Sequence, residues 1–234
     1  TGNLVVSRAM PANAPRIRHE FIAIDEGLVQ LLHVDENNPS RDWAAPIPHP
    51  QARDMQLIGG GRLLVGHHHG WCEFDVETGD LLDDFAPYEG VTAVRRQPDG
   101  STLVAGVDIA GATGVVVLQL DAARNEIHRA VYQGDYVRLI RQSPQGTLLM
   151  SCNDRIREAD LAGNYLREFP VDGFYHAWKS LRLPNGNLLV SAGYGAFMVE
   201  LDPSGAEIRR FGGKDRVPAE VNPFFYAMFQ RMPD

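Results

Sequence analysis

One short pattern recurs along the whole 234-residue chain: a glycine, one or two polar residues and an apolar run long enough for a β-strand. The copy that begins at Gly186 takes this glycine from a Pro-Asn-Gly sequence, whose residues favour the backbone angles of a tight turn. Such copies begin about 40 to 60 residues apart, at Gly2, Gly61, Gly100, Gly146 and Gly186. The chain is therefore expected to fold as a series of similar small sheets.

A second strand-length run follows each copy and ends in aspartate just before another turn, as at Trp71–Asp75 and Phe197–Asp202. An aspartate that opens a turn accepts hydrogen bonds from backbone N–H groups, which explains its recurrence without a catalytic role. Phe21–Asp25 is interpreted as this run in the first repeat. With the strands before and after, each repeat supplies a four-stranded antiparallel sheet, and such repeats are typical of β-propeller blades.

The predicted fold class is therefore all-β: one β-propeller domain over residues 1–234, with five four-stranded antiparallel blades. We expect the ring to close by pairing of the N- and C-terminal segments. In this scheme residues 224–234 form the first strand of the blade whose other strands come from residues 2–34, which leaves no free sheet edge. The alternative is a truncated chain whose parent protein carries a sixth blade.

Charge and hydropathy narrow the expected partners. The chain has 22 basic and 30 acidic side chains, a net charge of −8, and no long basic run. Nucleic acid and anionic membrane surfaces are therefore not expected partners. No segment approaches the ~20 apolar residues of a membrane span, so we expect a soluble protein, either cytoplasmic or periplasmic and secreted. Cys72 and Cys152 belong to non-adjacent repeats and are not expected to form a disulfide.

The longer and more varied loops are expected on one face of the ring. Successive turns of an up-and-down blade fall at alternate ends, so the turn between its second and third strands shares a face with the links between blades. The short Pro-Asn-Gly turns lie on the opposite face. A binding site is therefore expected on the loop-rich rim, around the mouth of the central channel.

Three consecutive histidines, His67, His68 and His69, are predicted to lie on this rim. Neutral imidazole binds transition metals and also titrates near neutral pH. One hypothesis is acid/base catalysis by His67 or His68 with His176, and another is a divalent metal site that includes His67, His69 and His176. The alternative is a strand end whose polar side chains simply face solvent or the channel. Further metal ligands would come from elsewhere on the rim: His49, His176 or Asp108.

Cationic residues recur on the first strands of the repeats. Arg53, Arg138 and Lys179 align to within about one position near the rim, so they could converge on an anionic ligand. The alternative is an internal ion-pair network with Asp54 and Asp135.

Aromatic and polar residues complete the predicted site. Tyr175 and Trp178 could form its walls, with His176 as a proton donor or acceptor, although aromatic residues that open a strand also pack between blades. Other rim residues that could contact a ligand are Tyr194, Asp108 and Asn153.

The phrase from Leu183 to Gly205, LPNGNLLV followed by ELDPSG, resembles the repeats of bacterial β-propellers of the NHL, PQQ-like and arylsulfotransferase-like kind. The resemblance covers nearly the whole chain and implies a propeller with a ligand face over its channel. It identifies no catalytic residue. Phe74–Gly79 is similar to a fragment of quinoprotein repeats, but the tryptophan-rich docking motifs of those proteins are missing. The resemblance thus implies no quinone cofactor.

These features favour a protein that binds a small polar, anionic molecule on the rim over the channel. A propeller enzyme is the alternative: a lyase, isomerase or hydrolase that uses rim histidines as acid/base groups or as ligands of a divalent metal. A third hypothesis is a protein-interaction platform built on the aromatic rim loops.

Overall fold

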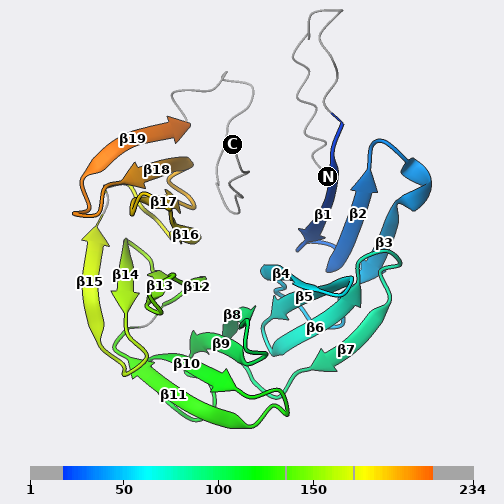
Figure 1. The fold of residues 1–234 in the computed structure, drawn as a ribbon, viewed down its shortest axis with the longest axis horizontal. Helices are drawn as coiled ribbons and strands as arrows, with labels where there is room; N and C mark the ends of the chain where they lie inside the picture. Colours follow the sequence, from blue (N-terminus) through cyan, green and yellow to red (C-terminus); the bar gives the residue numbers. More distant parts are fainter. Residues whose placement is uncertain (1–17, 135, 171, 213–234) are drawn as a thin grey trace, which may run out of the picture.

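The computed structural model describes residues 18–134, 136–170 and 172–212. Within these ranges the chain forms five antiparallel sheets arranged around a common centre (Figure 1). Four sheets have four strands, and strands that are consecutive in sequence are neighbours in each sheet. The first sheet has three described strands. The predicted five-bladed, all-β propeller is thus confirmed.

The strands follow the chain blade by blade. The first sheet contains β1 (Glu20–Asp25), β2 (Gln30–Asp35) and β3 (Trp43–Pro46), with a short 3-10 helix η1 (Pro39–Arg41) before β3. The second contains β4 (Asp54–Gly59), β5 (Arg62–His67), β6 (Gly70–Asp75) and β7 (Leu81–Phe85). The third contains β8 (Val91–Arg96), β9 (Thr102–Val107), β10 (Val115–Leu120) and β11 (Glu126–Tyr132). The fourth contains β12 (Ile140–Gln142), β13 (Leu148–Ser151), β14 (Arg155–Ala159) and β15 (Tyr165–Pro170). The fifth contains β16 (Lys179–Arg182), β17 (Leu188–Ser191), β18 (Phe197–Leu201) and β19 (Glu207–Gly212).

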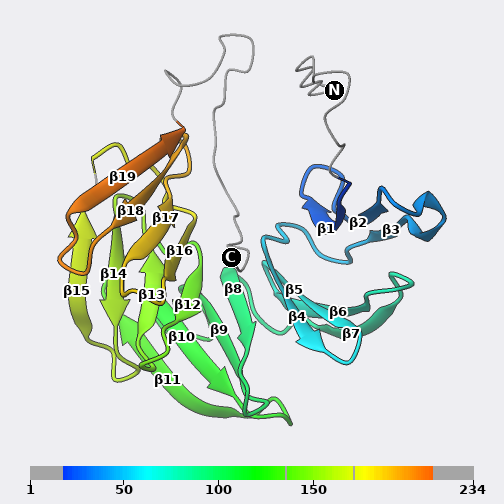
Figure 2. The same ribbon diagram turned by 45° about the horizontal axis from the view of Figure 1, so that its top comes forward.

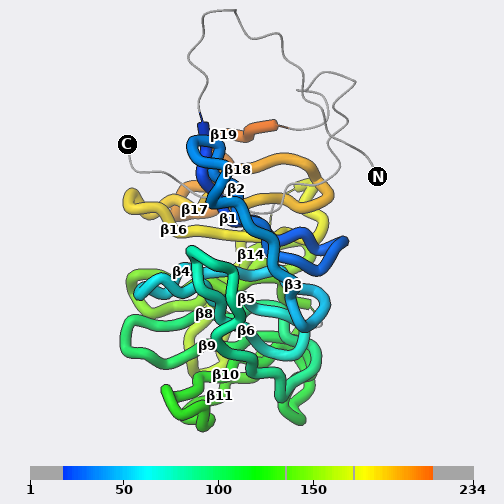
Figure 3. The backbone as a smooth tube through the Cα atoms, turned by 90° about the vertical axis from the view of Figure 1, so that its right-hand side faces the viewer, coloured from blue at the N-terminus to red at the C-terminus, as the bar shows by residue number. Residues whose placement is uncertain are grey.

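In the four-stranded sheets the first strand lies nearest the centre of the ring and the fourth lies outermost, as β4 and β7 do (Figures 1 and 2). Seen from the side, the turns gather on two opposite faces of the ring (Figure 3). The links between blades run from an outer strand to the next inner strand, so they share a face with the turns between second and third strands.

The first sheet corrects one strand assignment. β3 leads to the inner strand β4, as a fourth strand does in the other blades, so β1 occupies the second position and β2 the third. Phe21–Asp25, interpreted above as a third strand, is therefore the second. Asp35 is the aspartate that opens the third-to-fourth turn, where its Oδ1 accepts from Asn37 and Asn38 N–H at 2.8 and 3.0 Å. Residues 2–6 and 224–234 lie outside the described residues, and closure by them stays a prediction.

The recurring aspartates act as the sequence predicts. Asp75 Oδ1 accepts from the N–H groups of Glu77 and Thr78, each at 2.9 Å. Asp160 and Asp202 make equivalent bonds within their own turns. Side-chain hydrogen bonds, from Asn164 to Asp160 and from Ser204 to Asp202, lower the pKa of both aspartates, and the backbone hydrogen bonds to the ionised form add to these shifts. Their repetition reflects turn geometry and marks no active site.

The core lies between neighbouring blades. Leu63, Leu64 and Val65 on β5 are all buried, because one face of the sheet packs on the first blade and the other on the third. A strand buried on both faces reads as a continuous apolar run, which accounts for the Leu-Leu-Val pattern of the repeats. Cys72 and Cys152 are both free thiols within this buried core.

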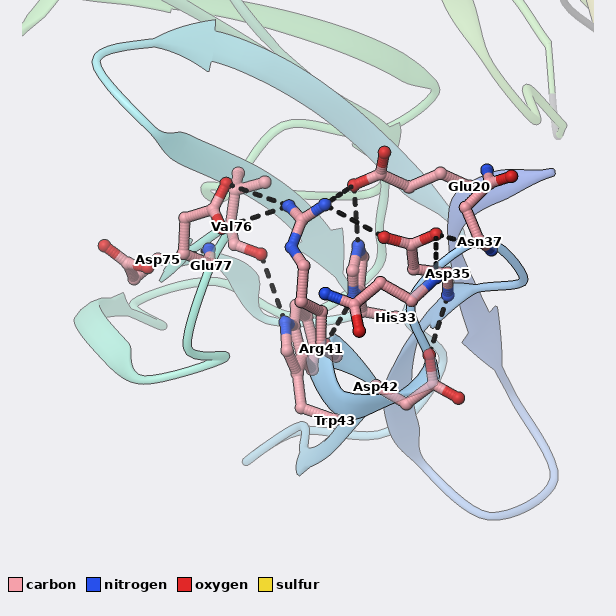
Figure 4. Close-up of polar contacts among 11 residues, drawn as sticks. Glu20, His33, Asp35, Asn37, Arg41, Asp42, Trp43, Asp75, Val76 and Glu77 are labelled. Atoms are coloured by element: carbon pink, nitrogen blue, oxygen red, sulfur yellow. Dashed lines mark hydrogen bonds and ion pairs between the residues drawn. The ribbon is translucent and has the colours of Figure 1, made fainter.

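Ion pairs also join consecutive blades. Arg96 on β8 pairs with Glu73 on β6 at 2.8 Å, and Arg182 on β16 pairs with Glu158 on β14 at 2.8 Å. Between the first and second blades, Arg41 contacts three carboxylates (Figure 4): Glu20 at 3.0 Å, Asp35 at 2.9 Å and Glu77 at 3.1 Å. In these contacts each charged side chain is paired with an opposite charge, so we interpret them as structural.

Among the described residues, no helix has the length and apolar character needed to cross a membrane.

Candidate functional site

Three blades present equivalent residues at the rim end of their inner strands. The backbone N–H of Arg53, Arg138 and Trp178 each donates to a carbonyl at the end of the second strand of its own blade, at 2.8 to 3.0 Å. The acceptors are Gly66, Ser151 and Ser191. Trp178, rather than Lys179, thus shares the position of the two arginines.

Arg138 is a buried guanidinium without an ion-pair partner in the described part of the chain. The residue is 8% exposed, and its Nε atom has no hydrogen-bond partner in the described ranges. The guanidinium lies over the Trp178 ring, 3.7 Å from the ring centroid. Burial and the nearby charge of Arg53 lower the pKa of Arg138 to about 10. The group is still charged at neutral pH, so its positive charge is available to a bound anion.

Arg53 is the second cation of this region. Its guanidinium pairs with Glu26 at 2.5 Å and donates to the Gln51 side chain at 2.9 Å. Glu26 lies in the turn between β1 and β2, on the same rim. Arg53 is close enough for its charge to affect both Arg138 and Tyr136. The structure therefore places Arg53 and Arg138 close enough for their charges to interact.

Lys179 lies near a different set of charged residues. It follows Trp178 by one residue, so the alternation of side chains on a strand directs it elsewhere. Its charge interacts with Arg141, Arg95 and Asp54, and burial together with the two arginines lowers its pKa to about 8. It borders a hollow of about 630 Å³ that Arg95 also lines. The expected convergence thus joins Arg53 with Arg138 but groups Lys179 with this other set.

Asp54 is at the centre of that set. It is completely buried, and it pairs with Arg141 at 2.8 Å and Arg95 at 3.5 Å. The three residues come from the inner strands of the second, fourth and third blades. The internal ion-pair network anticipated as an alternative therefore exists around Asp54, whereas Asp135 lies outside the described residues.

A cluster of aromatic rings surrounds His176. The His176 ring lies 4.9 Å from Tyr136, 4.5 Å from Tyr175 and 5.9 Å from Tyr194, between ring centroids. Tyr175 and Tyr194 are 61% and 48% exposed, so they form the outer wall of this cluster. Tyr136 is adjacent in sequence to the segment that carries Arg138. Aromatic residues of two blades thus face one another at the rim.

Two further buried polar atoms in this cluster have no hydrogen-bond partner within the described part of the chain: His176 Nδ1 and Asn153 Oδ1. The two residues are adjacent in space, because the His176 N–H donates to the Asn153 carbonyl at 2.8 Å. His176 has a φ of 55°, a left-handed conformation that is costly for a residue with a Cβ atom. Unsatisfied polar atoms and backbone strain concentrate where proteins bind ligands.

The histidine run forms a separate cluster. His67 is 1% exposed, and its ring stacks on His49 at 4.4 Å. His69 contacts both His49 and His68, and its Nδ1 lies 3.0 Å from the Tyr88 carbonyl. Burial lowers the pKa of His67 to about 4. Among the described residues, the set of side chains close enough to hold a metal ion joins His67 to His49 and Asp84 and includes neither His69 nor His176, so the expected metal grouping is not formed.

Asp108 contributes to its own loop. Its Oδ1 accepts from Gly114 N–H at 2.7 Å, and its own N–H donates to the Gly114 carbonyl at 2.9 Å. This pair of bonds holds the turn between β9 and β10 and provides a complete structural reason for the carboxylate.

Sequence reasoning missed two residues near these clusters. Asp84 contacts His49 Nε2 at 2.9 Å. Asp84 lies on an outer strand, where an acidic residue normally faces solvent, so the sequence offered no reason to select it. In the register of β6 and β7 it lies opposite Cys72, and that pairing is the signal that could have placed it near the histidines. Glu26 was missed because β1 was assigned as the third strand of its blade, which placed the turn after β1 on the face opposite the rim.

Comparison with known proteins supports the fold. No family model matches the chain, and no curated protein matches it. A crystal structure of a Bacteroides caccae protein of unknown function is similar, with a TM-score of 0.73 and 20% identity over 92% of this chain and 79% of that one. A streptogramin B lyase structure matches with a TM-score of 0.56 and 12% identity, over 82% of this chain and 65% of that one. Identities this low show a common fold alone.

Proposed function

We propose that this propeller binds a small anionic molecule at the rim, with Arg138 as the principal contact. The observation that carries the proposal is the buried Arg138 guanidinium, which has no carboxylate partner among the described residues. Burial of an unpaired charge is expensive, and an anionic ligand would offset that cost. The other first-strand arginines provide a contrast, since Arg96 and Arg182 are each paired with a buried glutamate.

The surroundings fit a compact ligand. The Trp178 ring fixes the Arg138 guanidinium from one side, which favours planar, bidentate recognition of a carboxylate or phosphate. Arg53 adds a second positive charge nearby. Asn153 Oδ1 and His176 Nδ1 have no hydrogen-bond partner among the described residues, so they are candidate acceptors for a hydroxyl or amino group carried beside the anionic group of a ligand.

The test is a thermal-shift and calorimetric screen of small carboxylates, inorganic phosphate and sulfate. We expect stabilisation by at least one of these anions, and an affinity at least tenfold weaker in Arg138→Met. Arg157→Met is the matched control, because the Arg157 guanidinium also lies over an aromatic ring, Tyr165 at 4.5 Å, but is paired with Glu168 at 2.8 Å. The absence of anion binding, or equal binding in Arg138→Met, would refute the proposal.

Catalysis at the same site is a second hypothesis, and His176 is the observation that favours it. A strained, partly buried imidazole with a free nitrogen is suited to proton transfer to or from a bound acid. The similar streptogramin B lyase structure shows that a lyase uses this fold. Turnover of a bound anion that is lost in His176→Gln while binding persists would support an enzyme; binding without turnover of any tested acid would support a binding protein.

A further inference from the structure

His49, His67 and Asp84 form a compact set of ligand atoms that shares no residue with the Arg138 site. One ligand atom from each residue lies within 4.8 Å of the others. His49 Nε2 is 2.9 Å from Asp84 Oδ1, and the two imidazole rings stack at 4.4 Å between centroids. The three residues come from the link before β4, the end of β5, and β7. The second blade and the link that precedes it thus converge on one point.

His67, the buried member of this set, has a ring nitrogen with no described hydrogen-bond partner. His67 is 1% exposed, and its Nε2 has no hydrogen-bond partner among the residues that the structure describes. Its Nδ1 accepts one long hydrogen bond, from His69 N–H at 3.2 Å. The pair formed by His49 and Asp84 is complete without His67, and stacking on His49 accounts for the ring of His67 but not for its unused nitrogen among the described residues.

We propose that His49, His67 and Asp84 bind a divalent first-row transition metal ion such as Zn²⁺. Two imidazoles and one carboxylate form a donor set that such ions prefer, and three protein ligands leave an open position for water. Coordination through His67 Nε2 requires the ring proton to occupy Nδ1, at the expense of the long hydrogen bond from His69. Coordination also replaces the hydrogen bond between His49 and Asp84, and any proton shared there is released.

The surroundings favour entry and orientation of the ion. The His49 and Asp84 side chains are 24% and 37% exposed, so an ion can reach the site from solvent without unfolding of the blade. Cys72 Sγ donates to Asp84 Oδ1 at 3.6 Å and thereby orients the carboxylate from the buried side. Such outer contacts commonly fix the ligands of a metal site.

The test uses tag-free protein stripped with a chelator and then titrated with Zn²⁺ by calorimetry, with elemental analysis of the dialysed product. We expect one ion per chain, and an affinity at least tenfold weaker in His49→Ala and in Asp84→Asn. Both residues are partly exposed, so these variants are expected to fold. Titration with Co²⁺ should give the visible absorption of a coordinated ion in the wild type and lose it in both variants.

The matched controls are His128→Ala and Asp83→Asn. His128 is also a partly buried histidine, bound to the Leu161 carbonyl, and Asp83 is paired with Arg124 beside the proposed site. Both controls should bind Zn²⁺ as the wild type does. Failure of the wild type to bind one ion, or equal binding in His49→Ala and Asp84→Asn, would overturn the assignment. Neither result bears on anion binding at Arg138, which involves other residues.

Discussion

At the scale of single residues, the chain buries positive charges at positions where burial destabilises the charged form. Arg138 is buried without a carboxylate partner in the described part of the chain, and burial lowers the pKa of both Arg138 and Lys179. A lowered pKa of a basic group means that folding disfavours its charged form. Such residues reduce stability, and proteins commonly retain such a cost where function requires the group.

Lys179 gives a pH-dependent prediction. Its pKa is about 8 in the folded protein and 10.5 without perturbation, so between these values the unfolded chain binds more protons. The contribution of Lys179 to stability therefore rises with pH through this window, and its cost is fully present below pH 8. Among the described residues, the charges that act on it include Arg141, Arg95 and Asp54.

We therefore expect Lys179→Met to unfold at higher urea concentration than the wild type at pH 7, with a smaller difference at pH 10. The difference between the two proteins removes the contribution of other titrating groups. A difference that is equal at the two pH values, or greater at pH 10, would contradict the assigned pKa shift.

At the scale of elements, tight turns hold the aromatic cluster. Gly193 has a φ of 57°, and a Cβ atom there would lie 2.1 Å from the His176 carbonyl oxygen and 2.7 Å from that of Tyr175. The turn between β17 and β18 thus packs directly against the link that carries both aromatic residues. Only glycine permits this approach.

Gly193→Ala should therefore displace Tyr175 and His176 and weaken anion binding. Gly186→Ala is the control, because Gly186 also has a positive φ of 88° but its Cβ atom would meet only Pro203, at 3.5 Å. We expect Gly193→Ala to cost about 1–3 kcal/mol more in unfolding free energy than Gly186→Ala. Equal stability and equal binding in the two variants would argue against this packing.

The repeats were sufficient to predict the blades but not their alignment. Glycine-led apolar runs and turn aspartates are set by local backbone chemistry, so they can be read from the sequence. The first repeat was displaced by one strand because its glycine, Gly2, is 59 residues before Gly61. The role of each cation depends on the register of its strand: a one-residue shift separates Lys179 from Arg53 and Arg138. The contact between His49 and Asp84 arises because the link before β4 packs against the outer strand β7, and no local sequence pattern indicates this packing.

At the scale of the whole molecule, the ring depends on charge at its centre. Asp54 connects inner strands of the second, third and fourth blades through Arg95 and Arg141. Asp54→Asn leaves these buried arginines without their carboxylate, so we expect a loss of about 3–5 kcal/mol in unfolding free energy. Asp154→Asn, which removes a pair with Arg155 at a 62% exposed side chain, should cost less than about 1 kcal/mol. Denaturant unfolding measures both, and equal effects would contradict a central role for Asp54.

The propeller also determines what the rim can recognise. Arg53 precedes the second blade, Arg138 the fourth, and His176 the fifth, and the ring brings these segments close enough for Arg53 to act on Arg138 and for His176 to contact Tyr136. The most direct measurement is anomalous diffraction from crystals soaked in selenate at low millimolar concentration. We predict an anomalous peak within hydrogen-bonding distance of the Arg138 guanidinium, on the side of Arg53, and its loss in Arg138→Met crystals. Selenate bound only at exposed arginines, with none at Arg138, would contradict the account.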